Sequence, residues 1–146
     1  MTKSFPLRVM FLCTGNACRS QMAEGLAREI GKGVVEPFSA GLIAAGLHPR
    51  AIGVMKEIGI DISKQKSKMV DEAVLKTMDI VITLCENAEA SCPRTPPEIQ
   101  RYHWPIRDPV ATFGPGEEIM KDFRRARDEI RGLIEIFINT VKQERT

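Results

Sequence analysis

Two short apolar runs, each followed directly by a cysteine, constrain the fold of this chain more than any other feature of its sequence. Residues 7–12 precede Cys13, and residues 79–84 precede Cys85. The second run is rich in β-branched side chains, which favour strands. Strands that read as unbroken apolar runs are typical of a parallel sheet covered by helices on both faces. Because ligands bind beyond the carboxyl ends of such strands, we expect both cysteines at a ligand site.

Helical periodicity fills the segments between and after these runs, as an α/β fold requires. The closing helix is the clearest, because apolar residues recur every three or four positions from Ile119 to Val141. The other expected helices are residues 20–30, ended by Gly31; residues 49–58, closed by Gly59; and a short helix capped by Ser67. Further strands are expected at residues 34–39, before a turn at 40–41, and at residues 102–104.

Length and composition predict a single domain, residues 1–146, in the cytoplasm. The chain has 146 residues, of which 43% are apolar and 27% charged, as in ordinary globular domains. Its net charge of +2 is too small to predict a nucleic-acid partner. The apolar run near its start is too short for a signal peptide or a membrane span. We therefore expect a cytoplasmic protein, in which cysteine thiols stay reduced.

Residues 13–20 read Cys-Thr-Gly-Asn-Ala-Cys-Arg-Ser and lie between a predicted strand and a predicted helix. A tight loop that enters a helix turns successive backbone N–H groups inward and forms a nest for an anion. Arg19 adds a planar guanidinium that can bind two oxygens of a tetrahedral oxyanion. The predicted oxyanion-binding residues are Thr14, Gly15, Asn16, Ala17, Cys18, Arg19 and Ser20.

Cys13 is the predicted nucleophile of this loop, because the helix dipole and Arg19 favour the thiolate form of its side chain. Ser20 is placed to donate a further hydrogen bond to the sulfur. The departing oxygen of an oxyanion needs a proton, and Asp108, stiffened by Pro109, is the candidate acid. Taken alone, Asp108 would be interpreted as a turn residue beside a proline, and only the neighbouring oxyanion loop favours a catalytic role. Together, these residues predict the attack of a thiolate on an oxyanion.

Cys85 and Cys92 form a second group of thiols, seven positions apart in a short polar segment that Pro93 ends. If this segment is helical, the two α-carbons lie roughly 10 Å apart along the axis, whereas a disulfide needs them within about 7 Å. Bridging them then requires the segment to unwind. The alternatives are a zinc site, for which the spacing is atypical, a permanent disulfide, which a reducing compartment disfavours, and a plain core position for Cys85. Redox chemistry is the favoured interpretation, and no metal site is predicted.

Taken together, these motifs resemble the thioredoxin-coupled arsenate reductases, whose fold is that of the low-molecular-weight protein tyrosine phosphatases. The resemblance runs nearly end to end, and Cys85 and Cys92 are its specific part, because the phosphatases have no use for that pair. It implies a three-layer sandwich with a central four-stranded parallel sheet flanked by helices. The motifs that carry it are residues 13–25 (CTGNACRSQMAEG), 39–41 (SAG) and 83–85 (TLC), Cys92-Pro93, and the HW and DP pairs within residues 103–109.

The resemblance implies a relay of three thiols that reduces arsenate to arsenite. In this relay Cys13 attacks arsenate held by the loop amides and Arg19, and Asp108 protonates the leaving oxygen. Cys85 then attacks Cys13, which releases arsenite and leaves a disulfide between the two. Cys92 attacks Cys85, and the resulting Cys85–Cys92 disulfide is passed to thioredoxin. No bound cofactor is implied, because the electrons come from thioredoxin.

The resemblance also implies partners and an ion. We expect binding of arsenate, phosphate and sulfate, exchange with thioredoxin, a monomer, and no membrane partner, with Cys18 as a spectator. Some members of the family bind potassium through counterparts of Asn16, Glu24 and Ser39 plus an acidic residue, whose place here is taken by Lys68. Because an ammonium group there would replace the ion, no potassium requirement is expected.

Two other functions remain open at the level of the sequence. A phosphotyrosine or small phosphomonoester phosphatase would use Cys13, Arg19 and Asp108 alone. The absence of tyrosines after Asp108-Pro109, where phosphatases often carry them, favours the reductase. A non-catalytic oxyanion-binding or redox-sensing module would bind sulfate or phosphate without turnover.

Overall fold

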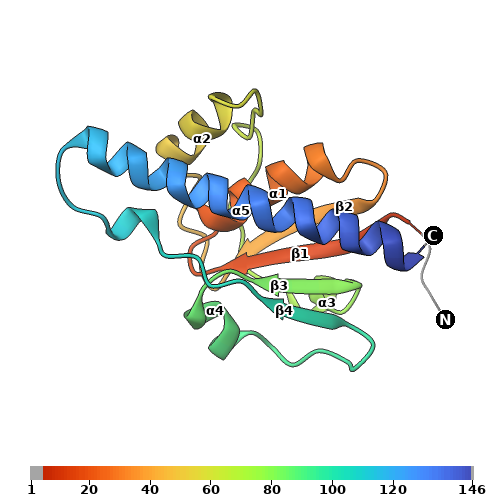
Figure 1. Cartoon of the computed structure of the whole chain (residues 1–146). Coiled ribbons are helices and arrows are strands. Elements are labelled where there is room, and N and C mark those ends of the chain that lie inside the picture. Colours follow the sequence, from red (N-terminus) through yellow and green to blue (C-terminus); the bar gives the residue numbers. More distant parts are fainter. Residues whose placement is uncertain (1–4, 146) are drawn as a thin grey trace.

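Four parallel strands form one sheet in the computed structural model, which describes residues 5–145. In order across the sheet the strands are β2 (Val35–Gly41), β1 (Leu7–Cys13), β3 (Ile80–Thr83) and β4 (Gln100–His103). Leu12 pairs with Ala40 of β2 on one side and with Thr83 of β3 on the other. The carboxyl ends of the strands therefore meet at one edge (Figure 1), and the predicted parallel sheet is confirmed. Residues 1–4 and 146, which the single-domain prediction includes, lie outside the described residues.

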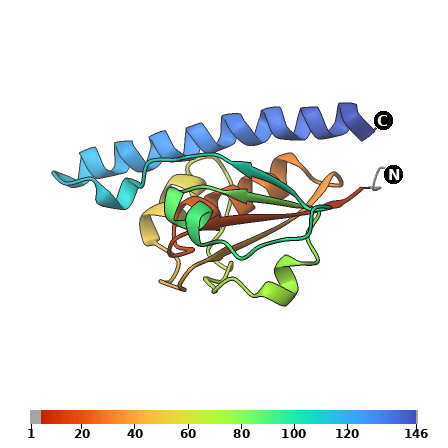
Figure 2. The same cartoon turned by 90° about the horizontal axis from the view of Figure 1, so that it is seen from below.

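Helices cover both faces of the sheet. α1 (Arg19–Ile30) and α5 (Gly116–Arg145) lie over one face, and the short α3 (Glu72–Leu75) lies over the other (Figure 2). α2 (Pro49–Lys56) packs against α1 and α5. This arrangement confirms the three-layer sandwich that the sequence predicts.

The remaining short helices lie near the carboxyl edge of the sheet (Figure 1). α4 (Glu86–Ser91) follows β3 and contacts both β1 and β3. A 3₁₀ helix, η1 (Pro109–Ala111), follows β4 and contacts α5. Within residues 5–145, no helix is long and apolar enough to cross a membrane.

The position of β1 explains why its sequence is apolar at every position except Arg8. It has a strand on each side and helices over both faces, so Leu7, Val9 and Phe11 are fully buried and Met10 and Leu12 nearly so. β4, by contrast, lies at the edge of the sheet and is exposed along its whole length. Its sequence therefore carries no apolar run, and the strand predicted at residues 102–104 begins earlier, at Gln100.

The segment around Ser67 is not the helix that the sequence predicts. The Ser67 hydroxyl accepts a hydrogen bond from the Gly46 N–H (3.0 Å) and donates one to the Gly15 carbonyl (3.3 Å). The prediction is wrong because this side chain supports the 13–20 loop. The cap of α3 is Asp71, whose carboxylate accepts from the Ala73 N–H.

β2 also differs from the prediction, because it continues through residues 40–41, where a turn is expected. Gly41 pairs with Cys13 at the end of β1 and forms a bridge with Met69. The strand is extended here because it lies against the 13–20 loop. A side chain at Gly41 would meet that loop, as a β-carbon would lie 2.6 Å from the Asn16 backbone nitrogen and 2.6 Å from the Ile43 carbonyl oxygen.

Replacing this glycine is expected to disturb the loop. Because the atoms that crowd the site belong to the backbone, Gly41→Ala should lower the free energy of unfolding by about 1–3 kcal/mol in urea titrations. Gly53→Ala is the control, since a β-carbon at that position of α2 meets nothing and should raise stability by about 0.5–1 kcal/mol. Wild-type stability of Gly41→Ala would show that the loop does not approach β2 this closely.

Glu57, directly after α2, joins that helix to α5 through two arginines. Its Oε1 accepts hydrogen bonds of 2.9 Å from Arg124 Nε and from Arg127 Nη1, and its Oε2 accepts one of 2.8 Å from Arg124 Nη2. The hydrogen bonds from Arg124, and then those from Arg127, lower the pKa of Glu57 from 4.5 to about 2, although desolvation opposes the shift. The folded protein thus holds this carboxylate in its charged form.

Stability should depend on pH through this carboxylate. Glu57→Gln should lower the free energy of unfolding near neutral pH by less than about 1 kcal/mol, because the carboxylate is partly exposed. Since folding depresses the pKa, the stabilisation is present above the pKa of an unfolded glutamate and is lost as the pH falls through about 2. Urea titrations at a series of pH values should show the variant and the wild type converging on acidification. A difference that stays constant down to about pH 3 would contradict this linkage.

Candidate active site

The 13–20 loop connects β1 to α1 at the carboxyl edge of the sheet, and its carbonyl groups are bonded outward. Those of Cys13, Thr14, Gly15 and Ala17 accept hydrogen bonds from the N–H groups of Leu42, Ile43, Ala45 and His48, respectively, at 3.2, 3.0, 2.9 and 3.0 Å. Because the carbonyls point outward, N–H groups of the same turns line the concave side of the loop. This is the geometry that an anion nest requires.

Asn16 holds the loop and orients the nucleophile. It is fully buried and has a φ of 49°, in the left-handed region that asparagine tolerates. Its Oδ1 accepts from the Lys68 N–H (2.9 Å), which fixes the orientation of the amide, so its Nδ2 donates to Ser20 Oγ (2.7 Å). Ser20 Oγ lies 2.8 Å from Cys13 Sγ, within hydrogen-bond distance. This chain of contacts joins the backbone of Lys68 to the sulfur of Cys13.

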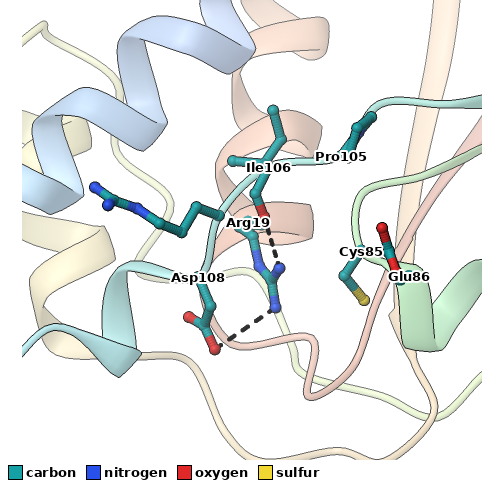
Figure 3. Close-up of a pocket in the computed structure, with 7 residues that line it drawn as sticks. Arg19, Cys85, Glu86, Pro105, Ile106 and Asp108 are labelled. Atoms are coloured by element: carbon teal, nitrogen blue, oxygen red, sulfur yellow. Dashed lines mark hydrogen bonds and ion pairs between the residues drawn. The ribbon is translucent and has the colours of Figure 1, made fainter.

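Arg19 begins α1 and lies beneath the segment that carries the candidate acid. Its side chain is mostly buried, and Nη1 donates to the Ile106 carbonyl at 2.9 Å. Its Nη2 lies 3.7 Å from Asp108 Oδ2. Figure 3 shows the guanidinium between these two groups. The arginine of the anion loop is therefore in contact with the loop that follows β4.

Asp108 lies over the site and is held within its own segment. It caps η1, because its Oδ1 accepts from the Val110 N–H at 2.9 Å. It borders a cavity of about 330 Å³ that Cys13 and the anion loop also line, and a neighbouring cavity of about 290 Å³ that contains Arg19 and Cys85. Its carboxyl can therefore face an anion bound in the loop.

Cys85 lies in the wall of the site beside the nucleophile. It is 8% exposed, and its Sγ lies 3.2 Å from the hydroxyl of Thr14, the residue after Cys13. The same sulfur caps α4 by accepting a hydrogen bond of 3.4 Å from the Ala88 N–H. The sequence places Cys13 and Cys85 at the ends of two strands, and the structure brings those ends together because β1 and β3 are neighbours.

Cys92 lies apart from the other two reactive thiols. It is the C-cap of α4, so the six residues of that helix separate it from Cys85, as the spacing predicts for a helical segment. Cys92 is half-buried, and burial is the largest factor that raises the pKa of its thiol. Nearby Glu89 raises this pKa further, whereas Arg101 lowers it. The residue is therefore held as a thiol while α4 remains folded.

Cys18 faces the same cavity as Cys13, and the pKa of its own thiol is strongly raised. Burial, followed by the charges of Asp108 and Cys13, raises the pKa of Cys18 to about 12, and Arg19 opposes the shift. Its thiol therefore stays protonated, and a protonated thiol is a poor nucleophile. This agrees with its predicted place as a spectator.

Several residues that surround Cys13 in the structure carry no recognisable signal in the sequence. Ile43, Ala45, His48 and Val110 line the cavity above Cys13 and come from three segments. His48 is the only polar side chain among them, and its Nδ1 accepts from the Arg50 N–H and caps α2. The step from His48 to Pro49 marks the start of a helix, but no sequence signal places that helix end beside the anion loop.

The pocket around Glu24, where the resemblance implies a potassium ion in some family members but none here, contains protein cations. Glu24 Oε1 accepts from the Ser39 hydroxyl (2.6 Å), and Glu24 Oε2 accepts from Arg28 Nη2 (2.5 Å). Lys68 lines the same pocket, and burial, opposed by Glu24, lowers the pKa of its ammonium group. These residues do not fit a bound cation, because both oxygens of the carboxylate already have donors. In the described part of the chain, no group of three or more His, Cys, Asp or Glu residues is placed to hold a metal ion.

Comparison with known proteins agrees with the resemblance seen in the sequence. A family model described as low molecular weight phosphotyrosine protein phosphatase matches residues 8–146. The arsenate reductase of Bacillus subtilis strain 168 is 47% identical over 134 residues, which are 92% of this chain and 96% of that protein. An arsenate reductase solved in the phosphate binding state is 35% identical, with a TM-score of 0.76, over 93% of this chain and 99% of that one. The thioredoxin-dependent arsenate reductase of Corynebacterium glutamicum is 28% identical, with a TM-score of 0.73, over 94% of this chain and 63% of that one.

The pocket lined by Glu24, Arg28 and Lys68 predicts how the thermal stability of the protein responds to potassium. Wild-type protein should unfold at the same temperature, to within about 1 °C, in potassium chloride and in sodium chloride, because no ion is needed there. Lys68→Asp combined with Arg28→Ala removes both cations from the pocket and frees one oxygen of Glu24, so the unfolding temperature of this double variant should rise when potassium replaces sodium. A clear potassium dependence of the wild type would contradict the replacement of the ion by Lys68.

Proposed function

The chain belongs to the low molecular weight phosphotyrosine protein phosphatase family, and from this premise we propose that it reduces arsenate to arsenite with Cys13, Cys85 and Cys92 as successive nucleophiles. The observation that carries the proposal is the place of Cys85. A phosphatase needs one thiol, yet here a second thiol lies in the wall of the site, with its Sγ 3.2 Å from Thr14 Oγ1. The proteins named arsenate reductase that cover nearly the whole chain support the same choice of substrate.

The first step joins sulfur to arsenic. Arsenate binds in the 13–20 loop, where the inward N–H groups and Arg19 balance its negative charge. The Cys13 thiolate forms a bond to arsenic, and one arsenic–oxygen bond breaks. Asp108 gives its proton to the departing oxygen, which leaves as water. Ser20 favours the thiolate before the attack through its contact with Sγ.

The second step is the reduction. The Cys85 thiolate attacks Cys13 Sγ, and the sulfur–arsenic bond breaks. Its electron pair stays on arsenic, which passes from As(V) to As(III) and leaves as arsenite. The two sulfurs are oxidised together to the Cys13–Cys85 disulfide. Only a short movement of Cys85 is required, because its sulfur already contacts the residue after Cys13.

The third step restores Cys13 and depends on α4. The Cys85 sulfur caps this helix, and a helix of six residues is marginal without its tertiary contacts. A disulfide sulfur is a weaker acceptor than a thiolate, so oxidation of Cys85 weakens the cap and favours unwinding. Unwinding also exposes Cys92 and so removes the burial that raises the pKa of its thiol. Cys92 then attacks Cys85, and Cys13 leaves as a thiolate.

Thioredoxin supplies the electrons in the last step. Its dithiol reduces the Cys85–Cys92 disulfide by two thiol exchanges and is itself oxidised to a disulfide. The chain then needs no bound cofactor of its own, because each exchange consumes one thiolate and releases another. A relay of this kind requires free thiols at the start of each cycle, which places the protein in the cytoplasm. All of its thiols lie in one chain, so a monomer suffices.

The phosphatase alternative is supported by the description of the family model. Cys13, Arg19 and Asp108 together form the equipment for hydrolysis of a phosphate monoester. Such hydrolysis would use the first step above, with phosphorus in place of arsenic, and would leave Cys85 and Cys92 without a role. The two functions therefore differ in their dependence on Cys92.

Substitution of Cys92 separates these functions. Cys92→Ser should stop the steady oxidation of NADPH in the presence of arsenate, thioredoxin and thioredoxin reductase. It should still release about one equivalent of arsenite per chain, because the first two steps do not use Cys92. Mass spectrometry after alkylation should find the Cys13–Cys85 disulfide in this variant and the Cys85–Cys92 disulfide in the wild type after a single turnover.

Ser91→Ala, in the same helix, is the matched control and should oxidise NADPH at the wild-type rate. If Cys92→Ser kept full steady activity, the relay would be wrong. If the wild type consumed no NADPH but hydrolysed phosphate monoesters, the phosphatase would be the correct function.

A further inference from the structure

A buried carboxylate outside the site, Asp122 of α5, holds the segment that carries Asp108. It is 7% exposed and lies in a helix whose other buried residues are apolar, apart from Arg127. Its Oδ1 accepts from Arg107 Nη2 at 2.6 Å, and its Oδ2 accepts a very short hydrogen bond from the Thr112 hydroxyl. Arg107 and Thr112 lie on the two sides of Asp108 in the sequence. One carboxylate thus binds both ends of the segment 107–112.

Arg125, one turn further along α5, adds two hydrogen bonds to this arrangement. We call Asp122 and Arg125, together with their hydrogen bonds to residues 107–112, the clamp. Its Nε donates to Asp122 Oδ1 at 2.7 Å, and its Nη2 donates to the Arg107 carbonyl at 3.0 Å. The backbone directly before Asp108 is therefore fixed to the helix. The hydrogen bond from Arg125, followed by those from Thr112 and Arg107, holds the pKa of Asp122 well below its usual range, although burial opposes the shift. The clamp is charged at every pH at which the protein would work.

The placement of Asp108 depends on this segment more than on contacts of its own with the site. Its side chain is 43% exposed, and its 3.7 Å separation from Arg19 Nη2 is too long for a hydrogen bond. Its Oδ1 is bonded to the Val110 N–H, within the clamped segment. The carboxyl therefore moves together with residues 107–112. Arg19 holds one end of this region at the Ile106 carbonyl, and Asp122 holds the rest.

We propose that Asp122 is a positioning residue for the general acid, because it clamps residues 107–112 to α5 and so sets the distance from Asp108 to the oxyanion above Cys13. The inference rests on the proposed function, in which Asp108 protonates the departing oxygen. Asp122 itself touches neither the substrate nor the reacting atoms. Its effect on the rate passes through Asp108 alone, because it contacts neither the anion loop nor the thiols.

The test compares Asp122→Asn, Asp108→Asn and the double variant in single-turnover release of arsenite. Asp122→Asn removes the charge with little change of shape, and it should slow the reaction about 10- to 100-fold, as a misplaced catalytic group does. The dissociation constant of inorganic phosphate should change by less than about threefold, because the anion loop and Arg19 are intact. Asp128→Asn, an exposed carboxylate of the same helix that pairs with Arg127, is the matched control and should react at the wild-type rate.

The double variant distinguishes positioning from general stability. If Asp122 acts only through Asp108, Asp108→Asn combined with Asp122→Asn should be no slower than Asp108→Asn alone. Losses that multiply in the double variant would overturn the proposal, as would an Asp122→Asn variant as fast as Asp128→Asn. If Asp122→Asn does not fold, Thr112→Val opens one side of the clamp while Arg107 and Arg125 still pair with the Asp122 carboxylate, and the same non-additivity is expected. An unimpaired Asp108→Asn would instead remove the acid from the proposed function and, with it, any role for Asp122 in positioning.

Discussion

The site depends on one buried hydrogen-bonded chain that begins outside it, at the backbone of Lys68. This N–H fixes the amide of Asn16, which donates to Ser20, whose hydroxyl is in turn within hydrogen-bond distance of the Cys13 sulfur. Asn16 also holds the left-handed turn that directs the loop carbonyls outward. The same side chain therefore shapes the anion nest and, in the proposed relay, positions the nucleophile. Gly41 lies so close to this loop that a β-carbon there would meet the loop backbone.

Asp108 and Cys13, the proposed acid and nucleophile, come from distant parts of the chain and are joined through Arg19. Arg19 belongs to the anion loop, yet its guanidinium is bonded to the Ile106 carbonyl and faces Asp108. From the other side, Asp122 binds the same segment to α5. α5 thus contributes in two ways. Its apolar stripe covers the sheet, and its first turns bind residues 107–112 beside the site. In the proposed mechanism, the packing of α5 on the sheet therefore also sets the position of the carboxyl group that donates the proton.

The three reactive thiols show how a fold can separate the steps of a reaction. Cys13 and Cys85 lie close together because their strands are neighbours in the sheet, whereas α4 keeps Cys92 away. The cap of that helix is the Cys85 sulfur itself. In the proposed relay, chemistry at Cys85 therefore weakens the element that restrains Cys92. A short helix whose cap is a reactive sulfur can unwind when that sulfur is oxidised, because the helix has little stability of its own.

Apolar runs and helical periodicity are local signals, so the sequence alone predicts the parallel sheet, the helices α1, α2 and α5, and the 13–20 loop. It also predicts that Cys13 and Cys85 meet at one edge of the sheet, since residues that follow parallel strands lie together there. It misplaces the cap of α3 because Ser67 is used by a loop distant in sequence. The packed fold was needed to show that the Lys68 backbone orients Asn16 and that Asp122 binds both ends of residues 107–112. These contacts join residues from separate parts of the chain, and no periodicity or motif in the sequence connects them. They form only when the helices pack on the sheet.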